Sequence, residues 1–292
     1  MKLAIVGYFG WYGSMAEWVA NAWEVNGHEV YKIDRKNIDV PLDAKFVLFV
    51  DCSEDYSKEI PITITQPKVF WSFDAQMPGG VERSVNISKR SDLVFSMNFE
   101  YGVTKLDKFG IDNIWMPATY DSTLVSSNPL QKGRPVKESF DVCMIGHPNS
   151  QERIELWKML NANYVCKTGK VESKDEYTNS MINCQIVVNQ PTEPWDVITG
   201  IRFFEATGFN KLCLQKVIKT KELEKLGFEN GRDFIYWNNF EDLKEKIDYY
   251  LVHHDERVEI AFNGFKKVQK MSMAAQAAKM EQIILNKFYD RL

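Results

Sequence analysis

The sequence lacks the excess of positive charge that proteins dedicated to nucleic acid usually carry. Its 36 Lys and Arg residues stand against 40 Asp and Glu residues, so the formal net charge is -4. Proteins held to DNA or RNA mainly by phosphate contacts usually show a basic excess. The charge balance therefore argues mildly against a dedicated nucleic-acid binder.

Paired cysteines are also missing. The sequence contains no CxxC motif among its five cysteines, which are Cys52, Cys143, Cys166, Cys184 and Cys213. Neither a zinc site nor a redox dithiol is indicated. Four of the five lie in apolar runs, which is typical of buried thiols in a reducing compartment.

Long apolar runs are absent as well. No stretch approaches the length of a membrane span. The apolar run within Met1–Gly7 is too short for a signal peptide and is typical of a first β-strand. We therefore expect a cytoplasmic protein without a membrane span.

What the first part of the sequence does contain is an alternation of apolar runs and helical spacing. After Ser14, apolar residues recur at intervals of three and four until Asn26-Gly27 ends the expected helix. Strands are expected at Leu3–Gly7, Glu29–Ile33, Lys45–Val50, Lys68–Ser72 and Leu93–Ser96. Such alternation predicts a parallel sheet with helices on both faces.

A proline-containing stretch, Pro117–Glu138, is the best candidate for an interdomain linker. Beyond it we expect strands at 140–145, 164–167, 185–189, 212–214 and 234–236, and helices at 150–160, 174–183, 201–207, 240–252, 255–271 and 273–288. Gly208 is expected to end the helix that starts at Ile201. The sequence thus predicts an α/β protein with Rossmann-like domains over 1–128 and 129–272 and a final helix over 273–292.

A glycine-rich loop follows the first expected strand and opens the first expected helix. It contains Gly10, Trp11, Tyr12 and Gly13, and its spacing is GxxGxxG rather than the GxGxxG of dinucleotide-binding proteins. Backbone N–H groups there can meet an acceptor or a phosphate. A structural turn and an NAD-type site, with Asp34 as the ribose-binding acid, remain open alternatives.

Polar residues also follow two other strands, where ligands of parallel sheets bind. Asp74 either caps the next turn or presents a carboxylate at the carboxyl end of its strand. Gly146 allows close approach to a ligand, and His147 stands at the same strand tip. Arg153, in the following helix, either reaches a phosphate or bridges to Glu152 or Glu155.

The most informative segments are Val187–Gln190 and Thr199–Gly208. Arg202 and Glu205 are three residues apart, so on a helix they share a face. Arg202 can clamp a diphosphate with its planar fork, and Glu205 can accept hydrogen bonds from ribose hydroxyls. The alternative is an ordinary surface ion pair worth under about 0.5 kcal/mol.

Together these segments resemble the CgeB-like (spore maturation protein) glycosyltransferases, relatives of the large retaining family with the GT-B fold. The resemblance is strongest over 189–271, and its core is Gly-Ile-Arg-Phe-Phe-Glu-Ala-Thr-Gly at 200–208. Further motifs that match are Leu226–Asp233, Phe240–Leu243, Tyr250–Arg257 and Ile260–Gly264, with looser landmarks at Trp71–Asp74, Trp115–Ala118 and Phe140–Val142.

The resemblance implies two Rossmann-like domains that face a cleft, with a C-terminal helix from Met273 that crosses back to the N-terminal domain. It implies a nucleotide-sugar donor on the C-terminal domain and an acceptor on the N-terminal domain. Arg202 corresponds to the phosphate-binding arginine, Glu205 to the ribose-binding glutamate and Gly146 to the glycine under the diphosphate. We expect donor contacts also from His147, Arg153 and Asn189, and catalytic roles for Asp74 and Arg202.

The sequence departs from the wider retaining family at one position. That family often carries a second glutamate eight residues before the ribose-binding one, where this sequence has Val197. Glu193 or Asp196 are nearby carboxylates, but no spacing demands either. The identity of the donor sugar, and whether transfer occurs at all, are therefore open.

From the resemblance we expect a glycosyltransferase that uses a nucleotide-sugar, most simply a UDP-sugar, and transfers the sugar with retention of configuration. We expect transfer without a metal, because no DxD-type motif is present. The acceptor is a polysaccharide, a protein, a small molecule or a hydroxymethylated base of viral DNA. For DNA the one basic candidate strip is Lys89-Arg90 with Arg83. A catalytically silent binding protein and an NAD-dependent enzyme are the alternatives, and the chain is expected to be a monomer or a homodimer.

Overall fold

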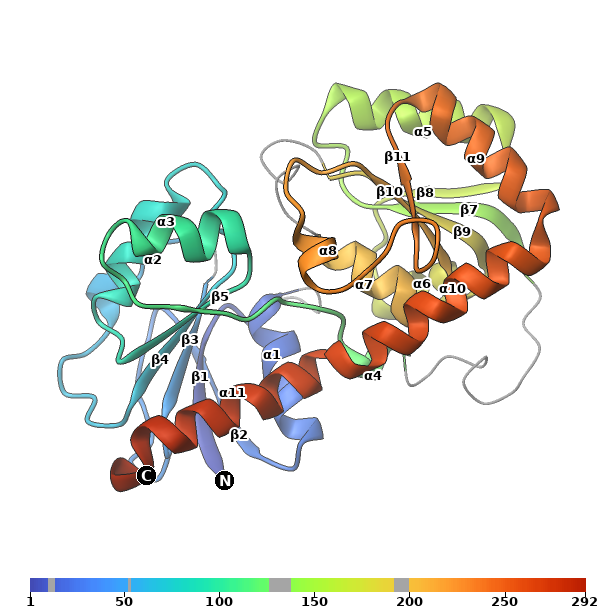
Figure 1. Ribbon diagram of the computed structural model, residues 1–292. Coiled ribbons are helices and arrows are strands. Elements are labelled where there is room, and N and C mark those ends of the chain that lie inside the picture. The colour runs from blue at the N-terminus through green and yellow to red at the C-terminus, as the bar shows by residue number, and fades with distance from the viewer. Residues whose placement is uncertain (10–13, 52–53, 126–137, 192–199) are drawn as a thin grey trace. The chain divides into compact units, whose positions relative to one another are not determined.

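The protein folds into two compact units, and the first of them is built from both the beginning and the end of the sequence. Unit 1 consists of Met1–Asp121 together with Ser272–Leu292, and unit 2 is the continuous stretch Ser122–Met271. Both chain termini thus belong to unit 1 (Figure 1). The computed structural model describes residues 1–9, 14–51, 54–125, 138–191 and 200–292.

Unit 1 contains a six-stranded parallel sheet with the strand order β2-β1-β3-β4-β5-β6. Its strands are β1 (Lys2–Gly7), β2 (Glu29–Asp34), β3 (Val47–Val50), β4 (Lys68–Ser72), β5 (Leu93–Ser96) and β6 (Ile114–Trp115). Its helices are α1 (Met15–Val25), α2 (Gly80–Ser88), α3 (Thr104–Asp107) and α11 (Met273–Phe288), with a π-helical turn at Phe99–Val103. The alternating order in sequence produces the predicted parallel sheet.

Helix α1 is specified by a cap and by a close contact with the first strand. The hydroxyl of Ser14 accepts a hydrogen bond from the N–H of Glu17 at 3.2 Å, which satisfies one free donor of the first turn. A Cβ on Gly7 would lie 2.5 Å from the Cβ of Ala16. Glycine at the end of β1 therefore lets α1 approach the sheet.

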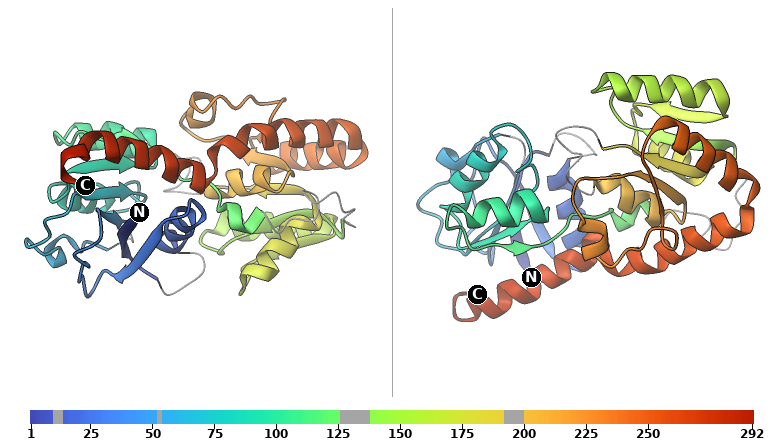
Figure 2. Two further views of the ribbon diagram at one scale, coloured as in Figure 1. Left: turned by 90° about the horizontal axis from the view of Figure 1, so that it is seen from below. Right: turned by 45° about the horizontal axis from the view of Figure 1, so that its top comes forward.

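Helix α11 packs on α1, although the two are far apart in sequence (Figure 2). The N–H of Met273 donates to the carbonyl of Tyr120 at 3.0 Å, and Nδ2 of Asn26 donates to the carbonyl of Ala274 at 2.8 Å. The buried side chains of α11 include Met273, Ala277, Met280, Ile284 and Phe288. The last stretch of the chain therefore completes the core of unit 1.

Unit 2 contains a five-stranded parallel sheet with the order β11-β10-β9-β7-β8. Its strands are β7 (Phe140–Ile145), β8 (Cys166–Gly169), β9 (Cys184–Asn189), β10 (Leu212–Lys216) and β11 (Ile235–Trp237). Its helices are α4 (Ser122–Val125), α5 (Gln151–Asn163), α6 (Lys174–Ile182), α7 (Ile201–Gly208), α8 (Glu222–Lys225), α9 (Phe240–Val252) and α10 (His254–Val268). One buried cluster joins β7, β9, β10 and β11 to α5, α9 and α10.

Helix α7 ends at Gly208, as expected, but the glycine is not the left-handed residue that stops it. That glycine is still helical, Phe209 is the C-cap, and the positive φ of 56° falls on Asn210. Asparagine tolerates the left-handed region better than most residues, so it takes the role that we assigned to glycine. Gly208 is instead buried inside the last turn of the helix.

Three of the four cysteines in the described part of the chain are buried, and Cys166 is half-buried. Cys52 lies outside the described residues. No helix in the described part of the chain is both long and apolar enough to cross a lipid bilayer.

Candidate functional site

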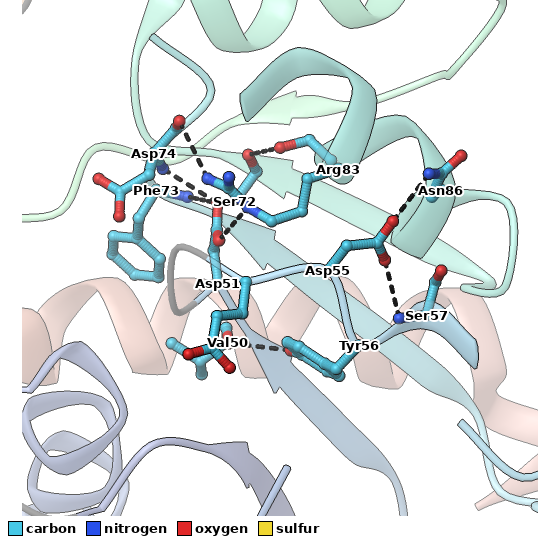
Figure 3. A network of polar contacts seen from close by, with 12 residues as sticks. Val50, Asp51, Asp55, Tyr56, Ser57, Ser72, Phe73, Asp74, Arg83 and Asn86 are labelled. Atoms are coloured by element: carbon cyan, nitrogen blue, oxygen red, sulfur yellow. Dashed lines mark hydrogen bonds and ion pairs between the residues drawn. The ribbon is translucent and has the colours of Figure 1, made fainter. Parts of the chain in front are cut away.

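Asp74 lies in unit 1, in the turn that follows β4, and its backbone is held by a buried ion pair (Figure 3). Asp51, which follows β3, accepts hydrogen bonds on Oδ2 from the N–H groups of Phe73 at 3.3 Å and Asp74 at 3.0 Å. Its Oδ1 accepts from Nε of Arg83 at 3.0 Å. Arg83 Nη2 then donates to the carbonyl of Asp74 at 3.2 Å. Both main-chain polar groups of Asp74 are therefore fixed.

The ion pair is almost fully removed from water, with 0% of the Asp51 side chain and 7% of the Arg83 side chain exposed. Arg83 therefore does not belong to the basic strip that was considered with Lys89-Arg90 for a DNA acceptor, nor to a solvated face. Its guanidinium faces inward and serves Asp51 and the Asp74 turn. A buried pair of this kind is costly to break, because either charge left alone is poorly solvated.

The side chain of Asp74 is half-buried and accepts a weak hydrogen bond on Oδ1 from Nε2 of Gln76 at 3.4 Å. Gln76 is held in turn by Nδ2 of Asn98, which donates to its Oε1 at 3.1 Å. A Cβ on Gly80 would lie 2.2 Å from the carbonyl oxygen of Asp74. The carboxylate is thus displayed from a tightly packed turn at the carboxyl edge of the sheet.

The glycine loop of Gly10, Trp11, Tyr12 and Gly13 lies outside the described residues. Asp34, the acid of the NAD-type alternative, accepts a hydrogen bond on Oδ1 from the N–H of Lys36 at 2.8 Å. That contact is an Asx-turn, a common structural use of Asp after a strand. The position of Asp34 thus has a structural explanation.

In unit 2, Arg153 crosses from α5 to the carboxyl ends of two strands. Its Nη1 donates to the carbonyl of His147 at 3.0 Å, and its Nη2 donates to the carbonyl of Gln190 at 2.5 Å. A Cβ on Gly146 would lie 3.1 Å from Nη1, so glycine leaves room for the guanidinium. Glu152, a surface partner considered for Arg153, instead binds Lys216 at 2.6 Å.

His147 itself is exposed, whereas Asn189 and Gln190 are buried at the end of β9. Nδ2 of Asn189 donates to Oε1 of Gln215 on the neighbouring β10 at 2.7 Å. Both polar atoms of the Gln190 side chain are buried and have no hydrogen-bond partner among the described residues. Nε of Arg153 is in the same state. Buried polar groups without a hydrogen-bond partner are uncommon in folded proteins. Those of Gln190 and Arg153 are therefore available to hydrogen-bond a ligand at this edge of the sheet.

Arg202 and Glu205 lie on the first turns of α7 and form an ion pair, with Nη1 of Arg202 2.8 Å from Oε2 of Glu205. The side chain of Glu205 is 3% exposed and that of Arg202 is 26% exposed. Tyr177 of α6 completes the cluster: its hydroxyl donates to Oε2 of Glu205 at 2.7 Å and also contacts Nη1 of Arg202. The pair is therefore largely buried rather than a surface ion pair.

Two positive charges act on one another at this edge of the sheet. Burial, and after it the positive charge of Arg202, lower the pKa of the Arg153 guanidinium. Burial is also the largest single effect on Arg202 and opposes its charge, but the carboxylate of Glu205 together with Tyr177 and Cys143 raises the pKa of that guanidinium overall. A nearby anion would relieve this unfavourable interaction between the two cations.

Residues 134–282 match the protein family described as "Glycosyl transferase-like", and the match covers just over half of the chain. The chain belongs to this glycosyltransferase family. The matched residues include β7 to β11 and the cluster of Arg153, Arg202 and Glu205. No curated protein sequence matches the chain significantly.

Solved structures show the fold of this glycosyltransferase. HepE of Anabaena, solved with UDP and glucose, has a TM-score of 0.67 at 12% identity, with 98% of this chain and 100% of that chain covered. Sucrose-phosphate synthase of Thermosynechococcus elongatus has a TM-score of 0.69 at 9% identity, with 99% of each chain covered. A DNA-modifying β-glucosyltransferase, solved with and without UDP-glucose, has a TM-score of 0.57 at 14% identity, with 97% and 98% covered. The prediction of two parallel-sheet domains in a GT-B fold is confirmed.

Within the described part of the glycosyltransferase, no group of three or more His, Cys, Asp and Glu side chains is placed to hold a metal ion. Val197, Glu193 and Asp196, which bear on the missing first glutamate, lie outside the described residues. Sequence reasoning did not single out Tyr177 and Asp51, and Gln190, although part of one of the most informative segments, was assigned no role. A role for Gln190 could have been assigned, because a polar residue that directly follows an apolar strand stands at the ligand-binding edge of a parallel sheet.

Proposed function

We propose that the protein transfers a sugar from a nucleoside diphosphate sugar, most simply a UDP-sugar, to an acceptor held by unit 1. In this proposal Arg153 and Arg202 bind the diphosphate, and Glu205 accepts hydrogen bonds from the ribose. The observation that carries the proposal is the ion pair of Arg202 with the buried carboxylate of Glu205, in a unit where Arg153 is held at two strand ends by the carbonyl groups of His147 and Gln190. In a nucleoside diphosphate, an anionic diphosphate is joined to a ribose that carries hydroxyl groups. Arginines suit the diphosphate, and a carboxylate suits the hydroxyl groups.

Catalysis in this proposal is mainly charge stabilisation. As the bond between the sugar and the diphosphate breaks, negative charge grows on the departing phosphate oxygens, and fixed cations stabilise it more than they stabilise the bound donor. The carbonyl groups of His147 and Gln190 hold Arg153 in place for this task. Asp74 is proposed to contact the acceptor hydroxyl, from a turn that the Asp51–Arg83 pair fixes. Retention of configuration and a CgeB-like relationship are proposed from the resemblance of the sequence.

The first test is ligand-induced stabilisation. We expect UDP at millimolar concentration to raise the melting temperature by several degrees, because a ligand at about 100 times its Kd adds roughly 2.7 kcal/mol to the folded state. GDP measures how strictly the base is read, and NAD serves as the negative control. A rise with NAD and none with UDP or GDP would contradict the proposal and favour a dinucleotide enzyme.

The second test concerns metals. We expect transfer, measured as UDP released from UDP-glucose in the presence of cell extract, to change by less than about twofold when EDTA is added, because arginines and N–H groups stabilise the leaving diphosphate. The matched control is the same assay with EDTA and a saturating amount of Mg²⁺. Activity that EDTA abolishes and Mg²⁺ restores would rule out metal-independent transfer.

A further inference from the structure

Tyr177 contacts both Arg202 and Glu205, and the proposed function assigns it no role. Its side chain is buried in α6, and its hydroxyl donates to Oε2 of Glu205 at 2.7 Å. The guanidinium of Arg202 lies over its ring, with Cζ 4.7 Å from the ring centroid, and Nη1 donates to the same hydroxyl. A single hydroxyl thus accepts from the cation and donates to the anion.

The carboxylate of Glu205 is engaged unevenly. Oε2 receives hydrogen bonds from both Tyr177 and Arg202, while Oε1 has no hydrogen-bond partner among the described residues. A carboxylate has room for about four hydrogen bonds. Arg202 is shared with the diphosphate in the proposed function, whereas Tyr177 is a neutral donor whose hydrogen bond to Oε2 does not compete with that anion. Tyr177 keeps the carboxylate in one plane, with Oε1 available to a ligand hydroxyl.

The hydroxyl of Tyr177 is needed for the contact with Glu205 rather than for the ring's contact with Arg202. The guanidinium lies over the ring face, and a phenylalanine would supply the same cation–π contact. What only tyrosine adds is the O–H that binds Glu205. Burial first, and the nearby carboxylate as well, raise the pKa of Tyr177 despite the opposing charge of Arg202, so the hydroxyl keeps its proton.

We propose that Tyr177 is a positioning residue that makes the donor site selective for ribonucleotides, by orienting Glu205 to accept from the ribose 2′-hydroxyl. The inference rests on the proposed function, in which Glu205 binds the ribose. It adds a residue on a different helix, 28 positions away from Glu205 in sequence. It also names the chemical group on the donor whose recognition depends on Tyr177.

The test measures binding of UDP and of 2′-deoxy-UDP by isothermal titration calorimetry, so it needs no acceptor. Wild-type protein is expected to prefer UDP by about 10-fold or more, since a hydrogen bond to a charged group is lost with the deoxy compound. Tyr177→Phe is expected to weaken UDP binding by roughly 5- to 10-fold and to leave 2′-deoxy-UDP binding within twofold. The preference for ribose therefore shrinks, while the ring contact with Arg202 is kept.

Tyr164→Phe is the matched control. The hydroxyl of Tyr164 also donates to a carboxylate, Oδ1 of Asp248 at 2.7 Å, and this pair joins the residue that caps the end of α5 to α9 in the same unit. Its removal is expected to leave both affinities unchanged. A third variant, Glu205→Gln, gives the reference for a site without the carboxylate. In that background Tyr177→Phe should cause no further loss of ribose preference, because both act through one contact.

The affinities of the wild-type protein and of Tyr177→Phe distinguish a failure of the inference from a failure of the proposed function. If Tyr177→Phe weakens both nucleotides equally, the hydroxyl supports the fold alone and the inference is overturned, whereas the proposed function stands. The same holds if the variant keeps the full preference for UDP. If wild-type protein binds neither nucleotide, or binds both equally, Glu205 does not read the ribose, and the proposed role of Glu205 fails together with the inference. Should Tyr177→Phe not fold, the wild-type and Glu205→Gln preferences still test the ribose contact, and Tyr177→His, which keeps a ring donor, tests its orientation.

Discussion

Replacing Arg202 with alanine is expected to lower the rate of UDP release from UDP-glucose by two to three orders of magnitude. Loss of one fixed donor to a developing anion typically costs this much in kcat, about 2.7–4 kcal/mol. Arg202→Lys keeps the charge but loses the planar fork, so an intermediate rate is expected. The measurement is the steady-state release of UDP at saturating UDP-glucose with cell extract as the source of acceptor.

The chain offers a closely matched control for Arg202. Arg232 also pairs with a glutamate three positions away, Glu229, but 64% of its side chain is exposed. Arg232→Ala should leave turnover unchanged. Near-full activity of Arg202→Ala would refute the assignment of Arg202 to the diphosphate. Because the alanine variant leaves Glu205 buried without its cation, the melting temperature of each variant is measured alongside its rate.

Replacing Asp51 with alanine is expected to destabilise unit 1 by about 3–5 kcal/mol, the usual cost of leaving one member of a buried ion pair alone. The loss includes the hydrogen bonds to the N–H groups of Phe73 and Asp74. Arg83→Met should cost less, because Asp51 keeps both N–H donors when the guanidinium is removed. Hydrogen exchange of peptides from β3 and β4 measures both effects locally.

Asp43→Ala is the control for Asp51. Asp43 also pairs with a cation, Lys2, but 55% of its side chain is exposed, and exposed pairs contribute little. Exchange in β3 and β4 should not change in this variant. If Arg83→Met proved more damaging than Asp51→Ala, the backbone contacts of Asp51 would not be the main support of the Asp74 turn.

Local patterns in the sequence predicted the elements of the fold well, because strand runs, helical spacing and caps are properties of neighbouring residues. The shared face of Arg202 and Glu205 follows from a spacing of three, and the structure shows them paired. Helix α7 does end at Gly208, but the left-handed residue beyond it is Asn210, two positions later. Small shifts of this kind follow from packing at the helix end, which composition does not encode.

The contacts that organise the candidate sites are of longer range and were not predicted. Asp51 and Arg83 are 32 positions apart, and Tyr177 and Glu205 are 28 apart. Each contact depends on which helix covers which strand end, and that depends on the completed sheet. A charged residue next to an apolar strand, such as Asp51, was the available signal. Its partner followed only from the packing of α2.

The interleaved order of the two units also determines when each can fold during synthesis. All 150 residues of Ser122–Met271 are translated after the sheet of unit 1 and before α11, the helix that packs on α1. Translation of this stretch takes roughly 10–30 s at ordinary elongation rates. Unit 2 is continuous, so its core needs no segment from outside Ser122–Met271. Unit 1 must wait with one face of α1 uncovered, so chaperone binding to the nascent chain is expected there.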